Sequence, residues 1–163
     1  MCRLVSAFGL LIVALFLTAS AIAAPPSATP TDIRGLWVDH REREKQAVAV
    51  WIDEYDGHMC GYIYWLKKPL SADGLPKRDR HNPNAALRAR PRCGLEILTG
   101  FRRLTENTWA DGQIYNPGDG QTYNGKLNLE SDGSLGIRGF VGMSIFGKTI
   151  EWVRPSEVPE RCK

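Results

Sequence analysis

The chain has 163 residues, and its 21 lysine and arginine residues nearly balance 18 aspartate and glutamate residues, for a formal net charge of +3 at pH 7. This balance excludes a protein that binds nucleic acid through its overall charge. The length is that of one domain, large enough to bury a core without a metal ion or a disulfide.

The N-terminal residues predict an export signal. Met1-Cys2-Arg3 is a short positive start, residues 4–17 are almost wholly apolar, and Ala21-Ile22-Ala23 ends the run with small residues. This is the three-part plan of a secretory signal, so we expect cleavage after Ala23 and a periplasmic or secreted protein. A single membrane anchor is the less favoured alternative, because the apolar run is short and no basic cluster follows it. The predicted organisation is a signal peptide over residues 1–23, a flexible leader over 24–32, one domain over 33–155 and a C-terminal tail over 156–163.

Three cysteines follow the predicted signal, namely Cys60, Cys93 and Cys162. Disulfides persist in exported proteins, and an odd number of cysteines permits one bridge and one remaining thiol. Cys60 and Cys93 both precede a glycine at an expected strand start, which favours this pair. Cys162 either replaces one of them or stays free. The absence of CxxC spacing argues against redox catalysis and against a zinc site.

Short β-rich segments separated by turn signals fill the domain. The turns are Asp56-Gly57, Asn116 to Gly120 and Ser131 to Gly133. Such regular spacing predicts an all-β fold, an antiparallel barrel or sandwich. In the last strands, Leu127 and Leu129 share one face while polar residues occupy the other, as a small closed barrel requires. The expected strands are 35–38, 47–52, 60–66, 95–104, 109–115, 122–129, 135–141 and 145–154.

Motifs spread over nearly the whole domain point to one family. They include GLW at 35–37, GYIYWL at 61–66, RPRCGL at 90–95, WADGQIYNP at 109–117, GQTY at 120–123 and FGKT at 146–149. Together they resemble the secreted bacterial proteins of Domain of Unknown Function 2147. The resemblance implies an antiparallel, eight-stranded, lipocalin-like up-and-down barrel that encloses a ligand cavity, and it implies no defined biochemical role.

The two ends of the predicted barrel carry a matching pair of residues. Trp37 lies on the first expected strand and Arg154 follows the last one. In a lipocalin-like barrel, the arginine lies across the tryptophan at the closed end. Such a contact between a guanidinium and an indole contributes about 0.5–2 kcal/mol. We therefore expect a structural role for both residues.

The long connection between the third and fourth expected strands predicts a structured lid. Asn82 is a good N-cap, Pro83 suits the first helical position, and residues 84–90 favour about two helical turns. Asp79 can anchor this segment by pairing with Arg88 or Arg90, which point in different directions on a helix.

The same connection is strongly basic. Between Lys68 and Arg92 it has seven basic and two acidic residues. If this connection covers the barrel mouth, one of Arg88 and Arg90 pairs with Asp79. The other arginine then faces either solvent or an anionic ligand. The aromatic residues Trp65, Trp109, Tyr115 and Tyr123 are further candidate ligand contacts, although packing in the core is the default for each.

We interpret the protein as an exported small-molecule-binding protein of the bacterial envelope, for an amphipathic or anionic ligand. The alternative is an envelope interaction or stress protein with a filled barrel. An enzyme is not expected, since the three histidines lack metal-binding spacing and no catalytic constellation is visible. No cofactor, metal, nucleic acid or membrane span after signal cleavage is predicted.

Overall fold

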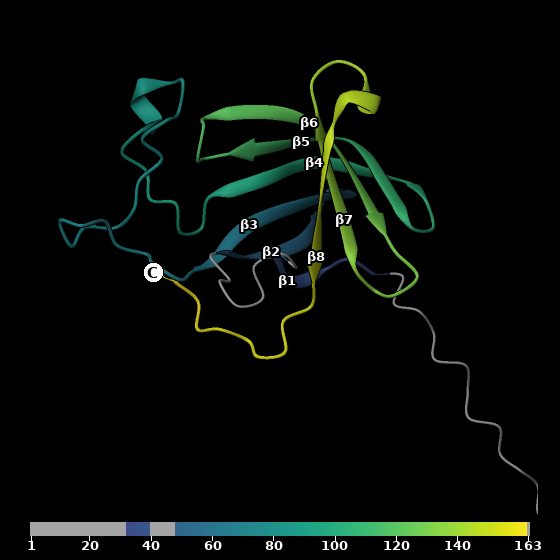
Figure 1. The fold of residues 1–163 in the computed structure, drawn as a ribbon, viewed down its shortest axis with the longest axis horizontal. Helices are drawn as coiled ribbons and strands as arrows, with labels where there is room; N and C mark the ends of the chain where they lie inside the picture. The colour runs from purple at the N-terminus through teal and green to yellow at the C-terminus, as the bar shows by residue number, and fades with distance from the viewer. Residues whose placement is uncertain (1–31, 40–47, 163) are drawn as a thin grey trace, which may run out of the picture.

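The computed structural model describes residues 32–39 and 48–162, so the predicted signal peptide and almost all of the predicted leader lie outside the described residues. Eight strands form one closed antiparallel barrel in which each strand pairs with its neighbours in the chain (Figure 1). This confirms the predicted fold class. The strands are β1 (Gly35–Asp39), β2 (Val48–Tyr55), β3 (His58–Leu66), β4 (Glu96–Thr105), β5 (Thr108–Asn116), β6 (Gln121–Leu129), β7 (Leu135–Phe140) and β8 (Lys148–Val153).

The barrel closes between its first and last strands, where Val38 pairs with Val153 and Asp39 with Trp152. No helix in the described ranges is long and apolar enough to cross a membrane. The described helical segments are two short 3₁₀ turns, η2 (Ala85–Leu87) and η3 (Ser144–Phe146). The last strand was expected to begin at residue 145, but it begins at Lys148, after η3. Arg138 stabilises this turn by donating hydrogen bonds to the carbonyl oxygens of Ser144 and Ile145.

The core fills the closed half of the barrel. Trp37 and Trp109 are each 1% exposed, and Phe101, in the same cluster, is fully buried. A Cβ atom at Gly112 or Gly125 would overlap the Phe101 ring. The two glycines therefore create the room that the phenyl ring occupies on the barrel interior.

Arg154 lies over Trp37 at this closed end. Its guanidinium carbon is 3.9 Å from the centre of the indole ring, the contact expected from the sequence. Nη1 and Nη2 donate to the carbonyl oxygens of Leu36 and Asp32 at 3.3 and 3.1 Å. Because burial of the guanidinium disfavours its charged form, the pKa of Arg154 is lowered.

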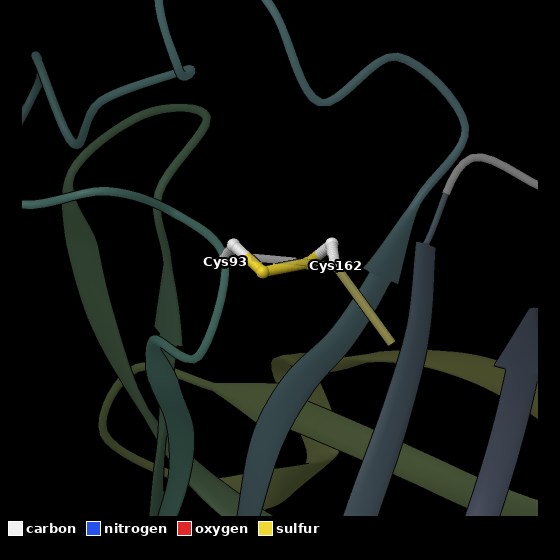
Figure 2. The surroundings of a disulfide bond; sticks show 2 residues. All are labelled: Cys93 and Cys162. Atoms are coloured by element: carbon white, nitrogen blue, oxygen red, sulfur yellow. A yellow bond between two sulfur atoms is a disulfide. The ribbon is translucent and has the colours of Figure 1, made fainter. Parts of the chain in front are cut away.

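The disulfide joins Cys93 to Cys162, so the predicted pairing of Cys60 with Cys93 is wrong (Figure 2). Cys60 is a free, buried thiol whose pKa is raised by burial. The Ile63 carbonyl accepts a hydrogen bond from Gly94 N, so Cys93 lies next to Ile63 on β3. Cys60 is three residues from Ile63 along this strand, about 10 Å away, which is too far for a disulfide with Cys93. The C-terminal segment instead returns to this place, because Cys162 N donates to the Tyr64 carbonyl.

The long connection from β3 to β4, residues 67–95, is called the crossover below. It leaves the barrel beside the β5–β6 hairpin (Figure 1), and its backbone makes a small ladder of its own, with Arg78 paired to Pro91 and Asp79 N bonded to Arg90 O. This pairing limits the helix to the single turn η2. The N-cap is Asn84, whose side chain accepts from Ala86 N, and not Asn82 as expected.

Candidate functional site

The open half of the barrel contains a cavity of about 890 Å³ that is open to solvent. The strands contribute aliphatic side chains to its wall, and the turns at the open end contribute polar groups to its rim. A filled barrel, the alternative considered from the sequence, does not fit this hollow half. The cavity is lined by Asp39, Val48, Val50, Ile63, Arg92, Ile97, Ile114, Tyr115, Asn116, Pro117, Gly118, Asp119, Tyr123, Ile137, Gly139, Phe140, Val141, Phe146, Lys148, Ile150 and Trp152.

The deep part of the cavity is apolar because strand alternation directs branched aliphatic side chains inward. Ile137 and Gly139 on β7 and Ile150 and Trp152 on β8 are two residues apart and line the same space. Gly139 leaves a gap in this wall, since a Cβ there would lie 3.6 Å from Tyr123 Cβ and make only ordinary contacts. Such a surface suits the apolar part of a ligand.

The rim carries two cations, Arg92 and Lys148, and two carboxylates, Asp39 and Asp119. Asp119 is held by its own turn: it accepts from Tyr123 Oη at 2.9 Å and from Asn116 Nδ2 at 2.8 Å. Burial raises the pKa of Asp119, but hydrogen bonds from Gln121 N, Tyr123 and Asn116 outweigh it, so the pKa is lowered. The hydrogen bond to Asp119 in turn raises the pKa of Tyr123.

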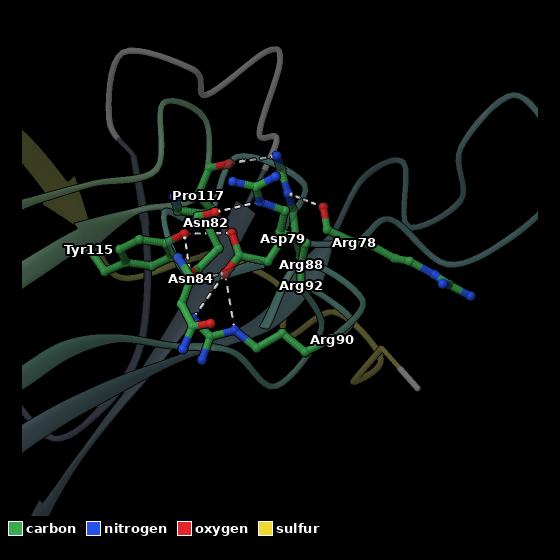
Figure 3. Close-up of polar contacts among 9 residues, drawn as sticks. All are labelled: Arg78, Asp79, Asn82, Asn84, Arg88, Arg90, Arg92, Tyr115 and Pro117. Atoms are coloured by element: carbon green, nitrogen blue, oxygen red, sulfur yellow. Dashed lines mark hydrogen bonds and ion pairs between the residues drawn. The ribbon is translucent and has the colours of Figure 1, made fainter. Parts of the chain in front are cut away.

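Arg92 is the crossover residue that reaches this cavity. Its Nη2 donates to the carbonyl oxygen of Pro117 at 2.6 Å and its Nε to that of Arg78 at 3.1 Å (Figure 3). The guanidinium is thereby fixed between the crossover and the β5–β6 turn. A positive charge in a set position at the mouth of an apolar cavity can recognise an anionic head group.

A buried carboxylate, Asp79, joins the crossover to β5 (Figure 3). Tyr115 Oη donates to its Oδ1 at 2.6 Å, and Asn82 Nδ2 donates to its Oδ2 at 2.8 Å. Arg90 adds a hydrogen bond from Nε at 3.0 Å and an ion pair from Nη2 at 2.9 Å, both to Oδ2. The side chain of Asp79 is completely buried, so these partners replace its hydration.

The electrostatics of this cluster follow from its contacts. Burial raises the pKa of Asp79, but the hydrogen bonds from Tyr115, Asn82 and Arg90 and the charge of Arg90 prevail and lower it. For Tyr115, burial and the hydrogen bond to the Asp79 carboxylate both raise the pKa. The cluster therefore consists of a carboxylate, a neutral phenol and a guanidinium at neutral pH, an arrangement that positions groups and holds the crossover in place.

The crossover also contacts the β5–β6 turn through its backbone. A Cβ at Gly120 would collide with the carbonyl oxygen of His81, and Gly120 has a φ of +76°. Only glycine satisfies both conditions without strain. The crossover thus forms one side of the rim and contributes only Arg92, among its described residues, to the cavity lining.

The structure brings two of the six predicted ligand contacts, Tyr115 and Tyr123, to the cavity. Trp109 is packed in the closed half, and Trp65 packs on the opposite face of the sheet from Trp37, against Leu36, Val38 and Ala49. These two tryptophans therefore do not line the cavity. Strand alternation and the bulge between Ala49 and Val50 decide which way a strand residue faces.

The two predicted crossover arginines make hydrogen bonds within the crossover. Arg88 Nε donates to the Asn82 carbonyl at 2.7 Å, and Arg90 pairs with Asp79. Arg90 also borders a smaller outer recess of about 260 Å³, together with Pro83, which makes no helix start. Arg92 and Lys148 were missed as rim residues. Strand alternation could have indicated Lys148, which is two residues from Ile150, whereas no local signal separates Arg92 from its basic neighbours.

Within residues 32–39 and 48–162, no group of three or more histidine, cysteine, aspartate or glutamate side chains is arranged to hold a metal ion. Cys93 is part of the disulfide and offers no free thiol for nucleophilic chemistry.

Comparisons with known proteins agree with this architecture. A family model described as an uncharacterized protein conserved in bacteria (DUF2147) matches residues 35–154. A solved structure described as protein HP1028 from the human pathogen Helicobacter pylori, which belongs to the lipocalin family, is similar with a TM-score of 0.64 and 26% sequence identity. That similarity covers 77% of this chain and 84% of the other. No curated protein matches the chain.

Proposed function

The chain belongs to the bacterial family DUF2147, and we propose that it is an exported protein of the envelope that binds a small amphipathic molecule. The apolar part of the ligand occupies the barrel, and an anionic head group lies at the rim beside Arg92 and Lys148. The observation that carries the proposal is the hollow, aliphatic half-barrel that opens at a polar rim.

The size and chemistry of the cavity support binding. Its volume of about 890 Å³ falls within the range of roughly 300–1,000 Å³ that is common for small-molecule sites. Its wall is aliphatic, and its polar groups gather at one end, so a molecule with one apolar and one polar part satisfies both regions. The similarity to a lipocalin-family structure also favours binding over catalysis.

The charge of the head group is inferred from the rim. Arg92 is immobilised by two carbonyl oxygens, and Lys148 is exposed at the start of β8. The carboxylates Asp39 and Asp119 also lie at the rim, and Asp119 is turned into its own loop by hydrogen bonds from Tyr123 and Asn116. Arg92, which is held in place, and Lys148 are the groups that an anionic head group would contact.

The export half of the proposal is supported by the disulfide between Cys93 and Cys162. Disulfides of this kind form and persist mainly outside the reducing cytosol. The apolar N-terminal run gives a route of export, although it lies outside the described residues. These two features together support the proposed periplasmic or secreted location.

Native mass spectrometry of protein purified from its own envelope tests the proposal. We expect a bound molecule on the wild type and on Asn124→Phe, which adds a phenyl group at an exposed position of β6. Gly139→Phe projects the same group into the cavity and should remove the bound molecule without unfolding the barrel. A wild type free of any bound molecule, or a Gly139→Phe variant that is folded and retains it, would contradict the proposal.

A further inference from the structure

The loop between β7 and β8 exposes an unusual amount of apolar surface. Four of its side chains are largely exposed, namely Val141 (73%), Met143 (64%), Ile145 (72%) and Phe146 (75%). The segment from Val141 to Gly147 contains no charged residue. A cluster of large apolar side chains in one exposed segment marks an interaction site more often than scattered ones do.

This loop, called the apolar rim loop below, is held in shape by its backbone. Arg138 donates from Nε and Nη2 to the Ser144 carbonyl at 2.8 and 2.5 Å, and from Nη2 to the Ile145 carbonyl at 3.2 Å. Its Nη1 donates to Thr149 Oγ1 at 2.9 Å. The carbonyl groups of Ser144 and Ile145 are thus satisfied by Arg138, while the side chains of Ile145 and Phe146 stay largely exposed.

The apolar rim loop lies at the mouth of the cavity. Val141 and Phe146, at its two ends, both line the cavity. Figure 1 shows the loop projecting beyond the ends of the β-strands. A surface that covers this loop would therefore lie directly next to the opening of the barrel.

The charge of the molecule is polarised along the barrel in a way that suits an anionic surface. The crossover, at the open end, has seven basic and two acidic residues between Lys68 and Arg92, and Lys148 adds a cation next to the apolar rim loop. The opposite end carries both signs of charge, with Asp56 and Glu130 in its turns and Arg103 and Arg154 beside them. The open end is therefore the end that an anionic surface attracts more strongly.

We propose that the apolar rim loop attaches the open end of the barrel to an anionic lipid bilayer. Ile145 and Phe146 enter the head-group region, while the basic crossover and Lys148 contact the lipid phosphates. This inference deepens the proposed function, because it places the cavity mouth where an amphipathic molecule can pass between membrane and barrel.

The charge pattern favours a bilayer over a second copy of the chain. A symmetric dimer through this loop would bring the same surface of both copies together, and each copy carries its basic crossover at the same open end of the barrel. Like charges would then face each other across the interface. A bilayer with anionic lipids pairs with both the apolar and the basic part of the surface.

Vesicle flotation tests the inference. Wild-type protein is mixed with vesicles of phosphatidylethanolamine and phosphatidylglycerol, and in parallel with vesicles of phosphatidylcholine alone. We expect binding to the anionic vesicles that weakens as salt is added. Ile145→Ser should lower the partition coefficient by about tenfold, since burial of the isoleucine side chain is lost. The matched control is Leu104→Ser, which removes a 65% exposed side chain of β4 and should bind as the wild type does.

Two further measurements separate this inference from the proposed function. Gly139→Phe, which fills the cavity, should still bind anionic vesicles, and Ile145→Ser, which changes a loop residue outside the cavity lining, should still carry the molecule that co-purifies with the wild type. Wild-type protein that does not float, or Ile145→Ser that floats equally well, would overturn the inference. So would a dimer in size-exclusion chromatography that depends on Ile145, because the loop would then bind a second copy.

Discussion

Replacement of Asp79 by alanine should be among the most destabilising single changes in the crossover. The carboxylate is fully buried and accepts hydrogen bonds from Tyr115, Asn82 and Arg90. Removing it leaves a phenol, an amide and a guanidinium without their acceptor. It also releases the contact that joins the crossover to β5.

The magnitude follows from these contacts. A buried donor without its acceptor costs about 1–3 kcal/mol, and loss of one partner of a buried ion pair costs about 3–5 kcal/mol. The side chain of Arg90 is 36% exposed, so water compensates part of its loss. We therefore expect Asp79→Ala to lower the free energy of unfolding by about 3–4 kcal/mol. For a domain of this length, the melting temperature should fall by about 10–15 °C.

Thermal and urea unfolding, followed by circular dichroism, measure this effect. Asp73→Ala is the matched control, because Asp73 lies in the same crossover but its ion pair with Arg80 is exposed and 3.7 Å long. Such a pair contributes at most about 1 kcal/mol. If Asp79→Ala unfolds at the same urea concentration as Asp73→Ala, the reasoning that the buried cluster stabilises the crossover is refuted.

Three further changes test separate parts of the structure. The lowered pKa of Asp79 means that its stabilisation is complete above about pH 4 and is lost as the pH falls through its folded pKa; urea unfolding should therefore show a steeper acid loss in the wild type than in Asp79→Ala. Arg154→Ala should lower the melting temperature by about 4–10 °C but leave the retention of the co-purified molecule unchanged, and an unaltered melting temperature would argue against the contact with the indole. Gly125→Ala should destabilise the barrel by about 1–3 kcal/mol in urea unfolding, because its methyl group meets the Phe101 ring; Gly139→Ala, which makes only ordinary contacts, should not.

The strands were predictable because their signals are local. Alternation put Leu127 and Leu129 on one face, and both are buried in the core. Gly and Asp residues at Asp56-Gly57 and Ser131-Asp132-Gly133 mark turns that the structure contains. Each of these signals depends on a few neighbouring residues, so one sequence is sufficient to read it.

The errors concern residues whose partners are distant in the sequence. Asn82 has good N-cap chemistry, but its side chain donates to Asp79 and to Tyr115, which is 33 residues away. Cys93 pairs with Cys162, at a sequence separation of 69, because the C-terminal segment returns to Tyr64. A buried hydrogen-bonded cluster outweighs the preference of one residue for a helix start.

The sequence by itself determined the order of the strands, the turns between them and, at Leu127 and Leu129, the residues that face inward, since alternation and turn chemistry act over a few residues. Only the tertiary structure decided that half of the barrel is hollow, that Arg92 and not Arg88 or Arg90 stands at its mouth, and which cysteines are joined. The physical reason is that an enclosed volume and a long-range contact depend on side chains from all the strands together. A short stretch of sequence does not indicate how those side chains pack together.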